Sequence, residues 1–171
     1  MYVLFEDLPL TLEHLVACDA YPSEIQLASI LAQVLSSLSY LTAAGFEHRS
    51  LISSNILLGL DGVIQIAALE DCHTHLLDQT QAQAMKALAT ITMELMQKYV
   101  KDDGVIGVDD VERWPVDSDA VGFLSATTSA GSIEELKGHA LITKRRCSRG
   151  ELVDLARFAL ISARTFYSYT P

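Results

Sequence analysis

Two short stretches of the sequence gather side chains that are common in catalytic and metal sites. The first runs from His48 to Asn55, and the second is Cys72-His73-Thr74-His75. A structural zinc site takes four ligands, usually from two paired clusters, whereas the second stretch is one cluster without a partner at suitable spacing. The sequence also lacks the G-x-S-x-G turn that exposes a nucleophilic serine in many hydrolases. We therefore expect no metal site, no cofactor and no serine hydrolase activity.

The first stretch resembles the catalytic loop of protein kinases, whose pattern is H-R-D-L-x-x-x-N. It lies between a helical segment, 23–44, and a predicted β-hairpin, 55–66, which is the order found in that family. Two acidic positions of the family are replaced, because Ser50 stands at the catalytic Asp and Ala68 at the metal-binding Asp of the D-F-G motif. Four positions match the loop pattern: His48, Arg49, Leu51 and Asn55.

These two replacements remove groups on which phosphoryl transfer depends. A serine hydroxyl cannot act as a carboxylate base near neutral pH, and general-base catalysis contributes roughly 10²–10⁴ in rate. A methyl group cannot hold the metal that neutralises phosphate charge. We expect the nearby Glu47, Glu70 and Asp71 to be exposed charges rather than substitutes. The resemblance therefore implies an inactive pseudokinase. The alternative is half of a kinase that binds ATP and transfers phosphate weakly once an N-terminal lobe is supplied.

Local patterns predict the elements around this segment. Ser23 and Gln26 form a capping-box pattern at the start of the helix over 23–44, and Gly45 ends it. Apolar residues at helical spacing predict further helices over 76–100 and 148–166. Thr11 is the expected N-cap of a short helix. The turn residues 59–62 between two apolar runs predict the hairpin.

The kinase resemblance covers nearly the whole chain and implies its fold class. That class is mainly α, a kinase-like C-terminal lobe with a small β-hairpin and an isolated N-terminal hinge strand at 1–5. We expect a single domain over 1–171. Its parts are a hinge-like strand (1–10), helices with the loop-like segment and hairpin (11–100), and a C-terminal helical subdomain (101–171).

Composition restricts the partners and the compartment. The 171 residues include 12 basic and 22 acidic side chains, so the net charge is −10 and disfavours nucleic acid. Lys144-Arg145-Arg146 with Arg149 is a local basic exception. Three scattered cysteines form no disulfide framework and suit a reducing compartment. No uninterrupted apolar run reaches roughly 18 residues, and the first residues lack a secretory leader pattern. We expect an intracellular, cytoplasmic protein without a membrane partner.

The same resemblance indicates where a partner would bind. In a full kinase the N-terminal lobe covers the hinge strand and one face of the hairpin. Without that lobe, an unpaired strand edge and an apolar patch would be exposed. We expect another protein, or a second copy of this chain, to cover them. The candidate contact residues are Val3, Phe5, Ile64 and Ile66.

Overall fold

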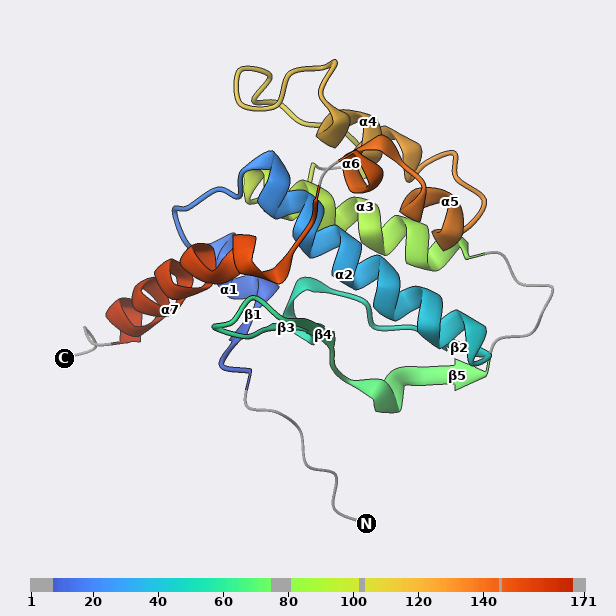
Figure 1. Ribbon diagram of the computed structural model, residues 1–171, viewed down its shortest axis with the longest axis horizontal. Helices are drawn as coiled ribbons and strands as arrows, with labels where there is room; N and C mark the ends of the chain where they lie inside the picture. The colour runs from blue at the N-terminus through green and yellow to red at the C-terminus, as the bar shows by residue number, and fades with distance from the viewer. Residues whose placement is uncertain (1–7, 75–80, 102–103, 145, 168–171) are drawn as a thin grey trace, which may run out of the picture.

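One long helix, α2 (Glu24–Ala43), lies at the centre of the molecule. The computed structural model describes residues 8–74, 81–101, 104–144 and 146–167. Figure 1 shows two small β-sheets on one side of α2. On its other side lie α3 (Ala82–Gln97), α4 (Asp119–Ala126), α5 (Ile133–Lys137) and α6 (Ala140–Thr143).

The start of α2 confirms the predicted capping box. The Ser23 hydroxyl accepts a hydrogen bond from the Gln26 backbone N–H at 3.3 Å, and the Gln26 side chain accepts one from the Ser23 N–H at 2.9 Å. The chain leaves the helix through Gly45, whose φ of +80° lies in the left-handed region that glycine adopts without strain. Both ends of the central helix were therefore readable from local sequence.

The composition of α2 also passes a test for membrane spans. The helix has 20 residues, and an 18-residue window within it has a mean hydropathy of 1.3. Polar residues interrupt this window, which is why it contains no uninterrupted apolar run. In the fold 44% of the window is buried, and α2 packs against both sheets and several helices. Its apolar composition is what a central core helix requires.

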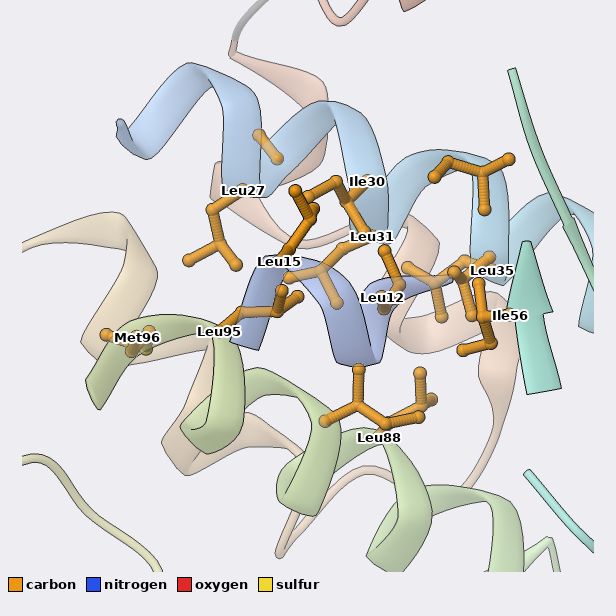
Figure 2. Close-up of a cluster of buried hydrophobic side chains, with 14 of the residues drawn as sticks. Leu12, Leu15, Leu27, Ile30, Leu31, Leu35, Ile56, Leu88, Leu95 and Met96 are labelled. Carbon is orange, nitrogen blue, oxygen red and sulfur yellow. The ribbon is translucent and has the colours of Figure 1, made fainter. Parts of the chain in front are cut away.

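The main core lies between α2, α3 and the short helix α1 (Leu12–Ala17). Figure 2 shows leucines of α1 pointing into the space between the two longer helices. Burying each such side chain contributes roughly 1.5–3 kcal/mol relative to exposure. The labelled side chains in this cluster are Leu12, Leu15, Leu27, Ile30, Leu31, Leu35, Ile56, Leu88, Leu95 and Met96.

Five short strands form two antiparallel sheets within the described residues. In the first sheet β3 (Ile56–Leu58) pairs with β4 (Ile64–Ile66) on one side and with β1 (Leu10–Thr11) on the other. The register places Ile56 opposite Ile66 and confirms the predicted hairpin. In the second sheet β2 (Phe46–His48) pairs with β5 (Cys72–Thr74).

The predicted fold class is therefore wrong. The described residues form a mixed helical and β structure with two small antiparallel sheets, and a kinase C-terminal-lobe fold is not shown. The three strands that sequence reasoning missed, β1, β2 and β5, have only two or three residues each, too few for an alternating pattern to be visible. Their partners are also distant in the sequence. The predicted hinge strand at 1–5 lies outside the described residues.

The C-terminal part contains a series of short helices before the last long one. Ser118 caps α4 and Ser132 caps α5, each accepting a backbone N–H at 3.3 Å. A short 3-10 helix, η4 (Arg149–Leu152), leads into α7 (Val153–Tyr167), close to the predicted 148–166. Helix α3 is shorter than the predicted 76–100, of which residues 76–80 lie outside the described part.

Candidate functional site

The loop-like segment begins at His48, the last residue of β2. Its ring is 3% exposed, and Nε2 donates a hydrogen bond to the Ala67 carbonyl at 2.8 Å. Within the described residues the other ring nitrogen, Nδ1, has no partner. The bond to Ala67 connects the start of the segment to the chain that follows the hairpin. His48 is thus a buried structural contact in this arrangement.

Asn55 and Ser50 are also joined inside the segment. The side-chain amide of Asn55 donates a hydrogen bond to the Ser50 backbone carbonyl at 2.9 Å. The backbone carbonyl of Asn55 accepts one from the Ala67 N–H at 2.8 Å. The neighbouring Arg49 is exposed, and its carbonyl accepts a bond from the Gln83 side chain at 2.9 Å. The structure therefore brings His48, Ser50 and Asn55 together through backbone carbonyls rather than around an open site.

Ala68 adopts a left-handed backbone conformation, with φ 54° and ψ 45°. This conformation costs an alanine roughly 1–2 kcal/mol relative to its ordinary regions. The residue starts η2 (Leu69–Asp71), in which the Asp71 N–H bonds the Ala68 carbonyl at 3.0 Å. Among the residues that the structure describes, no three His, Cys, Asp or Glu side chains are grouped so that they could hold a metal ion.

Residues 72–74 of the second stretch form strand β5, which pairs with β2 at the start of the first stretch. Cys72 pairs with His48, and His73 pairs with Glu47, while residue 75 lies outside the described part. Burial raises the pKa of the Cys72 thiol, and the negative charges of Asp71 and Glu70 raise it further. The thiol is therefore protonated at neutral pH, whereas nucleophilic attack and metal binding both need the thiolate.

A groove between α2 and β4 is a candidate binding surface, of which the sequence analysis named only some residues. We call it the α2–β4 groove, and its apolar part encloses about 440 Å³. Two of its side chains are notably accessible, since Tyr40 is 76% exposed and Leu69 is 47% exposed. The apolar part is lined by Ser36, Ser37, Tyr40, Leu41, Gln65, Ile66 and Leu69.

The groove continues into a polar part of about 410 Å³ that shares Ser36 and Ser37 with the apolar part. Arg149 is the charged residue that lines it, and no Asp or Glu of the described residues lines either part. The nearest acidic partner is Asp61, whose carboxylate lies 3.6 Å from the Arg149 guanidinium. The polar part is lined by Ser29, Ala32, Gln33, Ser36, Ser37, Ile64, Cys147, Ser148 and Arg149.

Gln33 and Gly62 hold the walls of this groove in place. The Gln33 side chain accepts the Ile64 N–H at 3.0 Å and donates to the Gly62 carbonyl at 3.1 Å, so α2 is tied to the hairpin. Gly62 has φ +82°, and a Cβ atom there would lie 1.8 Å from the Arg149 carbonyl oxygen. The hairpin turn therefore packs directly on η4.

The predicted partner-binding residues have different places in the structure. Ile66 is half-buried and lines the apolar part, whereas Ile64 is only 5% exposed and lines the polar part from beneath. Ile64 is thus not the open contact that we expected, because its side chain is part of the buried hydrophobic core. Val3 and Phe5 lie outside the described residues. Sequence reasoning missed Tyr40 and Leu69, although a tyrosine at the end of a mainly apolar helix was a usable signal.

The chain was also compared with known protein families. No family model matches it.

Proposed function

We propose that this protein binds a segment of another protein in the α2–β4 groove and transfers no phosphate. The observation that carries the proposal is the groove itself, an apolar hollow with Tyr40 and Leu69 exposed and, among the described residues, no acidic side chain in its lining. Exposed tyrosine and leucine side chains beside a hollow are typical of the anchor points of protein interfaces. On a chain of net charge −10, a strip without carboxylates is a distinct local environment.

The charge of the groove indicates the chemistry of the partner. Apolar side chains of the partner would lie on Tyr40, Ile66 and Leu69, and an acidic side chain would lie near Arg149. Arg149 is largely exposed, and its contact with Asp61 is long at 3.6 Å, so an incoming carboxylate can compete for it. The preferred occupant is therefore a short segment with aliphatic or aromatic residues and one or more acidic residues at one end.

The loop-like segment supports the absence of catalysis. The His48 ring and the Asn55 amide are engaged in hydrogen bonds to backbone carbonyls. Ser50 and Ala68 supply no carboxylate at the two positions where the kinase pattern has one. This reasoning favours binding over the alternative of a kinase half that is completed by a separate lobe.

A displayed library of random peptides tests the proposal with a defined probe. The full chain is immobilised, and peptides are selected on wild-type protein, with counter-selection on the double variant Tyr40→Ala, Leu69→Ala. We expect enriched peptides to combine apolar residues with acidic residues. Their affinity should fall about tenfold or more for the double variant, because anchor residues typically contribute more than 1 kcal/mol each.

Val116→Ala is the matched control, because Val116 is 75% exposed and lines neither part of the groove. Its peptide affinity should equal that of the wild type. Enriched peptides that bind the double variant as tightly as the wild type would contradict the proposal. So would light scattering that shows a dimer whose dissociation requires the Tyr40 and Leu69 substitutions, since a second copy would then occupy the groove.

A further inference from the structure

Ser148 lies in the most basic stretch of an acidic chain. Lys144, Arg145 and Arg146 precede it and Arg149 follows it, so four of the 12 basic residues fall within six positions. No other serine or threonine of the sequence has more than one Lys or Arg among the four residues before it. Clusters of basic residues before a hydroxyl are recognised by serine kinases whose peptide clefts are lined by carboxylates, since charge patterns set kinase specificity.

The structure presents Ser148 in a form that such an enzyme could accept. The residue is exposed and extended, with φ −139° and ψ 150°, and residues 146–148 belong to no helix or strand. Ser148 is the N-cap of η4, yet its hydroxyl makes no capping hydrogen bond. By contrast, the N-cap hydroxyls of Ser23, Ser118 and Ser132 each accept a backbone N–H. The Ser148 hydroxyl is therefore available for reaction without the loss of a cap.

From these observations we propose that Ser148 is a phosphorylation site for a basic-directed serine kinase that uses ATP. In the reaction the Ser148 Oγ forms a bond to the γ-phosphorus of ATP. The bond from that phosphorus to the β,γ-bridging oxygen breaks, and ADP leaves with the bonding electrons. The hydroxyl proton passes to the base of the attacking kinase. The product is a phosphoserine with a charge of about −1.5 to −2 at neutral pH.

The surroundings of Ser148 would stabilise such a phosphate. The exposed guanidinium of Arg149 is adjacent, and its contact with Asp61 is long at 3.6 Å. Arg146 is also exposed, while Asp61 and, two residues beyond Arg149, Glu151 are opposing negative charges. The phosphate would also lie at the start of the helical run formed by η4 and α7, where negative charge is favourable. The modified chain should therefore unfold about 1–4 °C higher than the unmodified chain.

The test uses the full folded chain, labelled ATP and the catalytic subunit of cyclic-AMP-dependent protein kinase as a basic-directed probe. Peptide mapping should locate one phosphate, on Ser148. Ser148→Ala should abolish the labelling, and Arg146→Ala should slow it about tenfold, which corresponds to the loss of one charge-assisted contact with the kinase. Ser125→Ala, which removes another exposed hydroxyl without basic neighbours, should leave the labelling rate unchanged.

Labelling that persists in Ser148→Ala, or that occurs only after the chain is unfolded, would overturn the proposal. A lower unfolding temperature in the phosphorylated protein would contradict the stabilising environment. A casein-type acidic-directed kinase serves as a comparison, and faster labelling by that enzyme would also count against the basic motif. No peptide partner enters these measurements, so their outcome is independent of the proposed binding function.

Discussion

The loop-like segment and the α2–β4 groove both border the β3–β4 hairpin, yet they use their side chains in opposite ways. In the segment, the residues with catalytic potential are engaged internally, as shown by the His48 bond to the Ala67 carbonyl and the Asn55 bond to the Ser50 carbonyl. In the groove, residues without catalytic potential, such as Tyr40 and Leu69, remain accessible. The polar motif therefore maintains the local fold, and the apolar surface is available to a partner.

A pattern of reactive residue types can therefore indicate a backbone arrangement as readily as a catalytic site. A histidine and an asparagine that bond to carbonyls can hold a loop in one shape whether or not carboxylates are present. If this view is correct, substitutions in the segment should lower stability and leave peptide binding intact. Substitutions on the groove surface should weaken peptide binding and leave stability intact.

The largest effect is expected where the two regions share a support, at Gly62. Gly62→Ala would force a side chain into the Arg149 carbonyl in addition to the strain of φ +82°. We expect a loss of about 2–5 kcal/mol in the free energy of unfolding. Gly45→Ala is the matched control, because φ there is +80° but a Cβ atom meets nothing within 4 Å. It should cost only about 1–2 kcal/mol.

Urea denaturation of both variants measures these free energies. Equal losses for Gly62→Ala and Gly45→Ala would mean that the contact between the hairpin turn and η4 contributes nothing to the free energy of unfolding. The common support of the two regions would then have to be sought elsewhere.

A second prediction concerns the segment alone. His48→Ala removes a ring that is 3% exposed and leaves the Ala67 carbonyl without its partner. We expect a loss of about 2–4 kcal/mol from the cavity and the lost hydrogen bond. Arg49→Ala, at the exposed neighbouring position, should change stability by less than about 0.5 kcal/mol. A His48→Ala protein as stable as wild type would show that the histidine does not hold the segment in place.

Several elements of this fold were predictable because their determinants are local. Ser23 and Gln26 form the expected cap of α2, Thr11 precedes α1, and β3 and β4 form the expected hairpin. The second sheet was not predictable, because β2 and β5 are three-residue strands that exist only through pairing with each other. No local pattern encodes that pairing, and the fold class derived from the kinase resemblance was wrong.

The candidate site was predictable only in part, for a related reason. Ile66 was named as a candidate partner contact because the kinase resemblance places an N-terminal lobe over one face of the hairpin, and in the structure it lines the groove. The burial of Ile64 could not be foreseen, because it depends on the packing of α2 and the rest of the core against β4. The accessibility of Tyr40 depends on which part of the α2 surface the neighbouring elements leave uncovered, which is a tertiary property.

A third prediction concerns the groove surface. Tyr40→Ala should weaken a selected peptide about tenfold while stability changes by less than about 0.5 kcal/mol, since the side chain is 76% exposed. Arg149→Ala should weaken it only about two- to fivefold, and this smaller loss should shrink as salt concentration rises. Fluorescence anisotropy with a labelled selected peptide measures both. A salt-independent loss for Arg149→Ala would indicate that the side chain acts by packing rather than by charge.

The smallest effect is a pH dependence that belongs to neither region. Burial lowers the pKa of His139 in the folded protein; the charge of Asp119 opposes this shift and that of Lys144 adds to it. His139 Nδ1 also accepts the Leu141 N–H at 3.2 Å as the cap of α6, and only a neutral ring can do so. Because the unfolded chain binds the proton more readily, the contribution of His139 is present above the ordinary pKa of about 6.5. It is lost as the pH falls from that value through the lower folded pKa.

His139→Asn separates this contribution from other titrations, because asparagine can cap a helix without titrating. Urea denaturation at several pH values between about 7.5 and 5 should show wild-type stability falling more steeply than that of the variant. Parallel curves would show that His139 is not responsible for the slope.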